Sequence, residues 1–284
     1  MSIKKTLLAA GIVAAVSAPT IASAVNIDGI EFEAGATLVI GTIYEGRVGA
    51  GGLVESGALI TAPGQQLGGV GIVDAIKNSA GATIWSNGDN GRELTLQFGG
   101  YIAETINGAG PIGINFSGGW VNFYSDAAQN FSPDFAPDDI AAATASANDG
   151  NQWLNYVGAS TGVTCVAADG CASGVGTDIT LQSFILAGDL LDIASGSGNG
   201  FLDVNMAGAG SANASFDTNS GGPLGQDASL GSSFNTRSAT GDFPASGSFD
   251  IRNQAVPEPG SIALLGLGLL SLGATTLRRR KKSA

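Results

Sequence analysis

Hydrophobic and polar residues alternate with a period of two through much of the chain between residues 25 and 255. Leu94, Leu96 and Phe98 fall on one face of such a run, and the polar residues between them fall on the other. This period is typical of β-strands that bury one face. The same pattern recurs at Ile112, Ile114 and Phe116, at Leu202, Val204 and Met206, and at Phe249 and Ile251.

Turn sequences rich in glycine, asparagine and serine separate these runs. They occupy residues 86–91, 107–108, 117–119 and 196–200. Short alternating strands spaced by such turns favour an all-β domain. We therefore expect a β-sandwich or jelly-roll-like body of short antiparallel strands, and about 230 residues can form one such domain.

One segment departs from the strand pattern. Pro137 is followed by two acidic residues and then by an alanine-rich run through Ala147. Proline is favoured in the first turn of a helix, where acidic side chains also interact well with the helix dipole. The segment predicts a short surface helix that ends near residues 148–150.

The N-terminus has the features of a secretory signal peptide. Lys4 and Lys5 precede an apolar run over residues 7–16, which is too short to span a bilayer. Ala22 and Ala24 place small residues at the −3 and −1 positions of a signal-peptidase site. We expect a signal-peptide helix over residues 1–24, removed by signal peptidase after Ala24.

The remaining body, residues 25–255, is strongly acidic. It contains five basic and 23 acidic residues, so its formal net charge is near −18. Such a surface repels phosphate backbones, and nucleic acid is therefore not expected as a partner.

Cys165 and Cys171 are the two cysteines of the chain. An exported protein meets an oxidising compartment, and Asp169-Gly170 between the cysteines is a turn dipeptide, so we predict a disulfide. A metal site is the alternative, but two thiols in a chain without histidine form a poor ligand set.

The C-terminus has the features of a membrane segment. Residues 261–277 carry no charge and would extend about 25 Å as a helix, slightly less than the hydrocarbon core of a bilayer. They precede the basic cluster Arg278, Arg279, Arg280, Lys281 and Lys282. Because basic residues stay cytoplasmic, we expect a transmembrane helix with its C-terminus inside.

The segment before this helix carries the most specific motif in the chain. Its residues are Val256, Pro257, Glu258, Pro259 and Gly260. Together with the apolar span and the basic cluster, this segment resembles the PEP-CTERM sorting signal over residues 256–282. The two prolines would hold it extended and accessible outside the membrane.

The resemblance implies recognition by an exosortase, a membrane transpeptidase that cuts near Pro-Glu-Pro. The protein would be exported through the inner membrane of a Gram-negative bacterium and transiently anchored there. It would then reach the cell surface or the exopolysaccharide matrix. The expected organisation is a signal peptide at 1–24, a secreted all-β domain at 25–255 and a sorting signal at 256–284.

The body is also similar to flocculation-associated PEP-CTERM proteins. The similar segments are residues 86–94, 119–124, 200–204 and 214–219. This resemblance implies a structural role in exopolysaccharide association, flocculation or biofilm formation.

The chain has no histidine, which excludes nucleophile–histidine pairs and histidine-containing zinc sites. No pair of acidic residues stands out as a glycosidase pair, so we expect no enzyme activity, cofactor or catalytic residue. Two acidic clusters leave calcium binding open, although a solvated acidic surface explains them more simply. They comprise Asp134, Asp138 and Asp139, and Asp189 and Asp192.

A discrete carbohydrate-binding module is the alternative function, because aromatic side chains can stack on sugar rings. On strands, however, aromatic residues more often belong to the core. The candidates are Trp85, Trp120, Trp153, Tyr101, Tyr124 and Tyr156.

Overall fold

The computed structural model describes residues 24–108, 111–131, 140–218, 224–237 and 243–254. The predicted signal peptide up to residue 23 lies outside the described residues, as do the sorting motif, the transmembrane helix and the basic cluster.

Strands dominate the compact unit Ala24–Ala255. Within its described residues the strands are β1 (Val25–Ile27), β2 (Ile30–Phe32), β3 (Thr37–Val48), β4 (Gln66–Ile72), β5 (Ala75–Lys77), β6 (Thr83–Ser86), β7 (Glu93–Asn107), β8 (Ile112–Asp126), β9 (Asn151–Ala159), β10 (Ile179–Gly188), β11 (Ile193–Val204), β12 (Ala228–Thr236) and β13 (Ala245–Asn253). The helical elements are α2 (Ile140–Ala147), α3 (Asn213–Phe216) and the 3₁₀ turns η1 (Asp89–Gly91) and η2 (Ala167–Asp169).

The predicted period of two is confirmed in the central strands. Leu94, Leu96 and Phe98 in β7 are buried, as are Phe249 and Ile251 in β13. In the third predicted run the pattern stops early, because β11 ends at Val204 and Met206 is 53% exposed.

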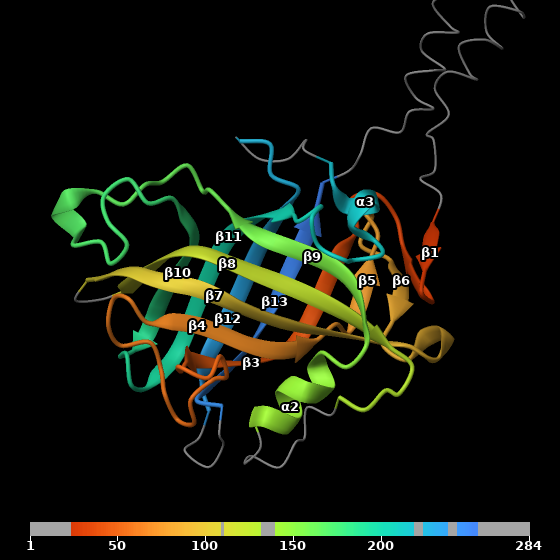
Figure 1. Ribbon diagram of the computed structural model, residues 1–284, viewed down its shortest axis with the longest axis horizontal. Coiled ribbons are helices and arrows are strands. Elements are labelled where there is room, and N and C mark those ends of the chain that lie inside the picture. The colour runs from red at the N-terminus through yellow and green to blue at the C-terminus, as the bar shows by residue number, and fades with distance from the viewer. Residues whose placement is uncertain (1–23, 109–110, 132–139, 219–223, 238–242, 255–284) are drawn as a thin grey trace, which may run out of the picture. The chain divides into compact units, whose positions relative to one another are not determined.

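The strands close into an antiparallel barrel of eight positions instead of the predicted sandwich. Going round the barrel, the order is β3, β4, β7, β8, β10, β11, β12 and β13, and β13 pairs again with β3 (Figure 1). In this last pairing Leu38 lies opposite Ile251 and Glu45 lies opposite Ala245. Alternation shows that a strand buries one face, but not whether the first and last strands meet.

β9 and β10 share one position of the barrel, between β8 and β11. β8 pairs with β10 along its first half and with β9 along its second half. The antiparallel strand β11 likewise pairs first with β10 and then with β9. The strands are accordingly longer than predicted. Residues 117–119 and 196–200, which we expected to be turns, lie inside β8 and β11.

Glycine explains both errors, because it allows close packing within strands as well as turns. In β11 a Cβ on Gly196 would lie 2.3 Å from the ring of Phe234 on β12. Gly118 and Gly119 have positive φ angles inside β8, as does Gly100 in β7. Gly100, Gly118 and Gly119 lie near one another in the β7–β8 pairing, where Tyr101 is opposite Gly118.

The predicted helix is present as α2, and the part described begins at Ile140. Its buried residues Ile140, Ala143 and Ala147 belong to a small cluster outside the barrel, with Val70 of β4 and Phe243. None of the helices within the described ranges is long and apolar enough to cross a membrane.

Aromatic side chains pack within the main core beside the short hairpin β1–β2 and α3. Phe32 stacks on Phe216, with 4.7 Å between the ring centroids, and Trp153 meets both rings edge-on. Of these three rings, Trp153 is the one that the sequence offered as part of a candidate sugar platform.

Candidate functional site

The predicted sites fall into two groups. Ala22 of the signal-peptidase site, the sorting motif at 256–260 and the basic cluster at 278–282 lie outside the described residues, while Ala24 is the first residue described. The cysteines, the aromatic candidates and the second acidic cluster lie on the barrel.

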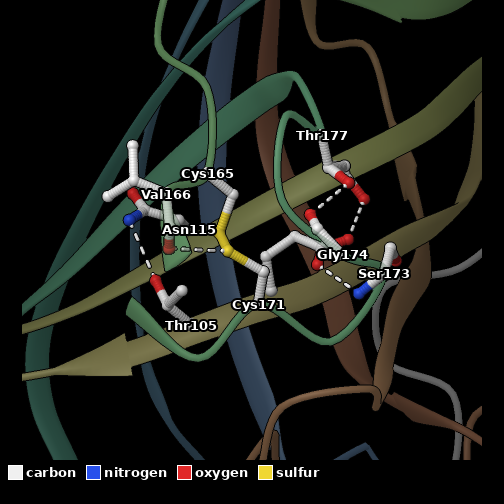
Figure 2. The surroundings of a disulfide bond; sticks show 10 residues. Thr105, Asn115, Cys165, Val166, Cys171, Ser173, Gly174 and Thr177 are labelled. Carbon is white, nitrogen blue, oxygen red and sulfur yellow. Dashed lines mark hydrogen bonds between the residues drawn. A yellow bond between two sulfur atoms is a disulfide. The ribbon is translucent and has the colours of Figure 1, made fainter. Parts of the chain in front are cut away.

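Cys165 and Cys171 are joined by a disulfide, as predicted (Figure 2). The bond closes a loop over residues 165–171 that includes η2 and the positive-φ residue Gly170. The Sγ atom of Cys171 lies 3.2 Å from the carbonyl oxygen of Val166. Since a disulfide sulfur carries no hydrogen, this is a packing contact.

Glu104 of β7 ties the disulfide loop to the barrel wall. Its Oε1 accepts a hydrogen bond from the Ser117 hydroxyl and its Oε2 accepts one from the Ser173 N–H at 2.7 Å. The Ala172 N–H donates to its carbonyl oxygen at 3.2 Å. Burial tends to raise the pKa of the Glu104 carboxyl, but the hydrogen bonds from Ser117 and Ser173 outweigh it and hold the pKa below its usual range.

The tryptophans occupy different environments. Trp85 and Trp153 are 1% and 0% exposed and cannot present a face to a sugar. The buried indole N–H of Trp85 has no hydrogen-bond partner among the described residues. Trp120 is half-buried on β8, and its indole lies against Gly99 and Gly100 of β7.

Trp120 borders a shallow groove of about 170 Å³ on the outside of the barrel. The groove combines apolar side chains with two amides, those of Gln66 and Gln97. The Trp120 indole N–H makes no hydrogen bond within the part of the chain that the structure describes. Among the candidate tyrosines, Tyr101 and Tyr156 are buried and Tyr124 is half-buried.

The second acidic cluster is engaged in local structure. Oδ1 of Asp189 accepts hydrogen bonds from the N–H groups of Leu191 and Asp192 in the β10–β11 turn. Oδ1 of Asp192 accepts one from the Thr236 hydroxyl at 3.1 Å. Across the described ranges no group of three Cys, Asp or Glu side chains is arranged to hold a metal ion.

A cavity of about 70 Å³ lies among the inward-facing side chains of the barrel. Most of its lining is aliphatic or aromatic and comes from strands all round the barrel. The lining residues are Ile43, Glu45, Gly46, Leu59, Ile60, Leu67, Phe98, Tyr101, Ile114, Phe116, Val121, Leu181, Ser183, Ile193, Leu230, Ser232, Phe234, Ala245 and Phe249.

Glu45 supplies the one carboxyl group of this lining. It is 8% exposed, and its side chain has no hydrogen bond or ion pair within the described residues. Burial raises the pKa of this carboxyl to about 7. Burial also raises the pKa of Tyr101, the other titratable group of the lining.

Sequence reasoning missed Glu45, which it counted only as one of many surface acids. Alternation could not have found it, because the buried residues Leu38 and Ile40 would place Glu45 on the opposite face of β3. A register shift in the β3–β13 pairing, between Gly247 and Phe249 of β13, places Ile43 and Glu45 on the inner face. A buried acid is costly unless it is paired or functional.

No curated protein and no solved structure matches the chain significantly. Residues 255–281 match the family model described as the PEP-CTERM protein-sorting motif. This motif implies that the chain is exported, processed by an exosortase and directed to the cell surface.

Proposed function

We propose that this protein acts structurally in the exopolysaccharide matrix at the cell surface, in polysaccharide association, flocculation or biofilm formation. The observation that carries the proposal is the sorting motif at residues 255–281, which implies delivery to the surface where such a matrix forms.

The barrel suits a scaffold in a hydrated matrix. Each strand of the ring is paired on both sides, so the ring leaves no open edge for uncontrolled strand pairing. The acidic body keeps the protein soluble, and divalent cations can bridge it to acidic polysaccharide. The proposed role is not catalytic, because a chain without histidine lacks the commonest general base.

Replacing Pro257, Glu258 and Pro259 together by alanine tests this role. We expect the variant cells to grow and make polysaccharide normally, to lose the protein from the surface and to stop clumping, as a gene deletion should. Sedimentation of cells and assay of polysaccharide in the medium measure this result. Normal clumping in both strains would refute the matrix role, whereas clumping lost in the deletion alone would show that the sorting motif is dispensable for it.

The groove beside Trp120 supports a second candidate, a carbohydrate-binding module. An indole held flat by Gly99 and Gly100, next to two glutamine amides, offers a stacking face and hydrogen-bonding groups. Val157, which lies opposite Trp120 on β9 and is 37% exposed, provides a matched control.

A titration with fragments of the exopolysaccharide distinguishes the two candidates. A binding module should show saturable binding that Trp120→Ala weakens at least tenfold and Val157→Ala leaves unchanged. Absence of saturable binding, or an equal effect of both variants, would remove this candidate and leave the structural role.

A further inference from the structure

The cavity among the inward-facing side chains of the barrel is a candidate binding site to which none of the motifs in the sequence refers. Its volume of about 70 Å³ exceeds the roughly 10–15 Å³ that one water requires and is about half of the roughly 150 Å³ of an apolar cavity that binds benzene, so it suits a ligand of only a few heavy atoms. Its walls are mainly apolar, and the hydroxyls of Ser183 and Ser232 with Tyr101 add a few polar positions. An apolar pocket with few polar groups is the usual form of a small-molecule site.

Among the described residues, no cation pairs with the carboxyl group in this cavity. Arg47, two residues further along β3, is engaged with Glu55, with 2.7 Å between its Nε and the carboxylate oxygen. Arg237 lies over the ring of Tyr44, which belongs to the cluster outside the barrel. None of the cavity-lining residues is basic.

A buried carboxyl without a partner is unfavourable in a domain that could hold an apolar residue at the same position. The residue opposite Glu45 in the β3–β13 pairing is the buried Ala245, so the surroundings of the carboxyl are apolar. A ligand that brings its own positive charge would supply the missing partner. The acidic body would also raise the local concentration of such a cation.

We propose that the barrel cavity binds a small apolar amine, with the ammonium group paired to Glu45 and the hydrocarbon part against the aromatic wall formed by Phe98 and Phe249. This proposal is independent of the matrix role, because it concerns the inside of the barrel and the matrix role concerns its outside. It assigns the cavity to a class of ligand and not to a particular metabolite.

Leu59 and Ile60 place the site beneath a segment between β3 and β4. This segment is held by a hydrogen bond from the Gly64 N–H to the Ala103 carbonyl at 2.7 Å and by the Arg47–Glu55 contacts. Glu45 is buried, so an ion pair formed with its carboxylate is stronger than the same pair in water. Specificity should accordingly depend on the charge of the ligand as well as on its size.

Calorimetric titration of the mature protein with propylamine and with 1-propanol, which are small enough for the cavity, tests the proposal. We expect the amine to bind at least tenfold more tightly than the alcohol. Glu45→Gln should abolish this preference, while Glu31→Gln, which changes a carboxyl outside the cavity lining, should preserve it. Equal binding of amine and alcohol, or an unchanged preference in Glu45→Gln, would overturn the proposal.

Two further measurements remain informative if Glu45→Gln does not fold. Because the carboxylate form pairs with the ammonium, amine affinity of the unaltered protein should rise about tenfold from pH 6 to pH 8, through the pKa of about 7. Ala245→Leu should fill the cavity and abolish binding of both probes. A pH-independent affinity, or unchanged binding to Ala245→Leu, would place the amine elsewhere.

Discussion

At the scale of single residues, the most unusual group is the Glu45 carboxyl. This titratable side chain is buried in the barrel, which offers it no hydrogen-bond or ion-pair partner within the described residues. Glu104 shows the contrasting solution, because hydrogen bonds from Ser117 and Ser173 stabilise its carboxylate. The two acids therefore shift their pKa values in opposite directions on the same barrel.

Stability should depend on pH through Glu45. The pKa of its carboxyl rises from 4.5 to about 7 on folding, so the unfolded chain loses this proton at a lower pH than the folded protein. The raised pKa of Glu45 contributes about 3 kcal/mol to the free energy of unfolding. This contribution is complete below pH 4.5 and is lost as pH rises through 7.

Urea unfolding at several pH values, compared between the unaltered protein and Glu45→Gln, measures this contribution. Other acids titrate in both proteins, so the difference between the two curves isolates Glu45. We expect the variant to gain stability relative to the unaltered protein between pH 5 and pH 7.5. Parallel curves would show that Glu45 titrates normally.

At the scale of elements, the β7–β8 hairpin packs aromatic side chains of one strand against glycines of the other. Tyr101 of β7 packs over Gly119 of β8, and Trp120 of β8 packs over Gly99 and Gly100 of β7. These packing contacts couple an aromatic residue of the cavity wall to one of the outer groove. Glycine at these positions is required by contact as well as by backbone angle.

Gly119→Ala should therefore destabilise the protein more than a glycine replacement at an open turn. Gly119 has φ +92°, and a Cβ there would lie 2.2 Å from the Tyr101 ring. Gly81 has φ +83° with nothing within 4 Å of the same position. The backbone angle alone costs about 1–2 kcal/mol, and the clash adds about 1–3 kcal/mol in Gly119→Ala only.

The difference between the two variants can be measured as a shift in the midpoint of urea unfolding. Gly81→Ala serves as the matched control for the backbone term. If both variants lose the same stability, the packing of Tyr101 on Gly119 contributes nothing.

At the scale of the whole molecule, the sorting motif and the barrel are separate parts of the chain that depend on the sequence in different ways. The sorting motif is a linear segment that other proteins read, whereas the barrel exists only after distant strands have paired. Processing and folding should therefore be separable by experiment.

Intact-mass measurement of the surface protein tests the predicted processing. We expect an N-terminus at Val25 and loss of the residues that follow the Pro-Glu-Pro motif, because signal peptidase and exosortase each act on an exposed segment. The barrel should remain intact, with no free thiol from Cys165 or Cys171. Surface protein that keeps the basic cluster at 278–282 would contradict exosortase processing.

Features that depend on residues close together in the chain could be predicted from the sequence alone. Alternation predicted the strands around Leu94 and Phe249, an alanine-rich run predicted α2, and six-residue spacing in an exported chain predicted the disulfide. The sorting motif was readable for the same reason, because its recognition depends on residues that are adjacent in the chain.

How the strands assemble and what they enclose depends on contacts between residues that are far apart in the chain. Closure of the barrel depends on β3 meeting β13, from opposite ends of the body, and no local pattern encodes that pairing. The same pairing encloses Glu45 beside a cavity. Burial of Trp85 and Trp153 and partial exposure of Trp120 also follow from long-range packing, since all three tryptophans lie in similar strand sequences.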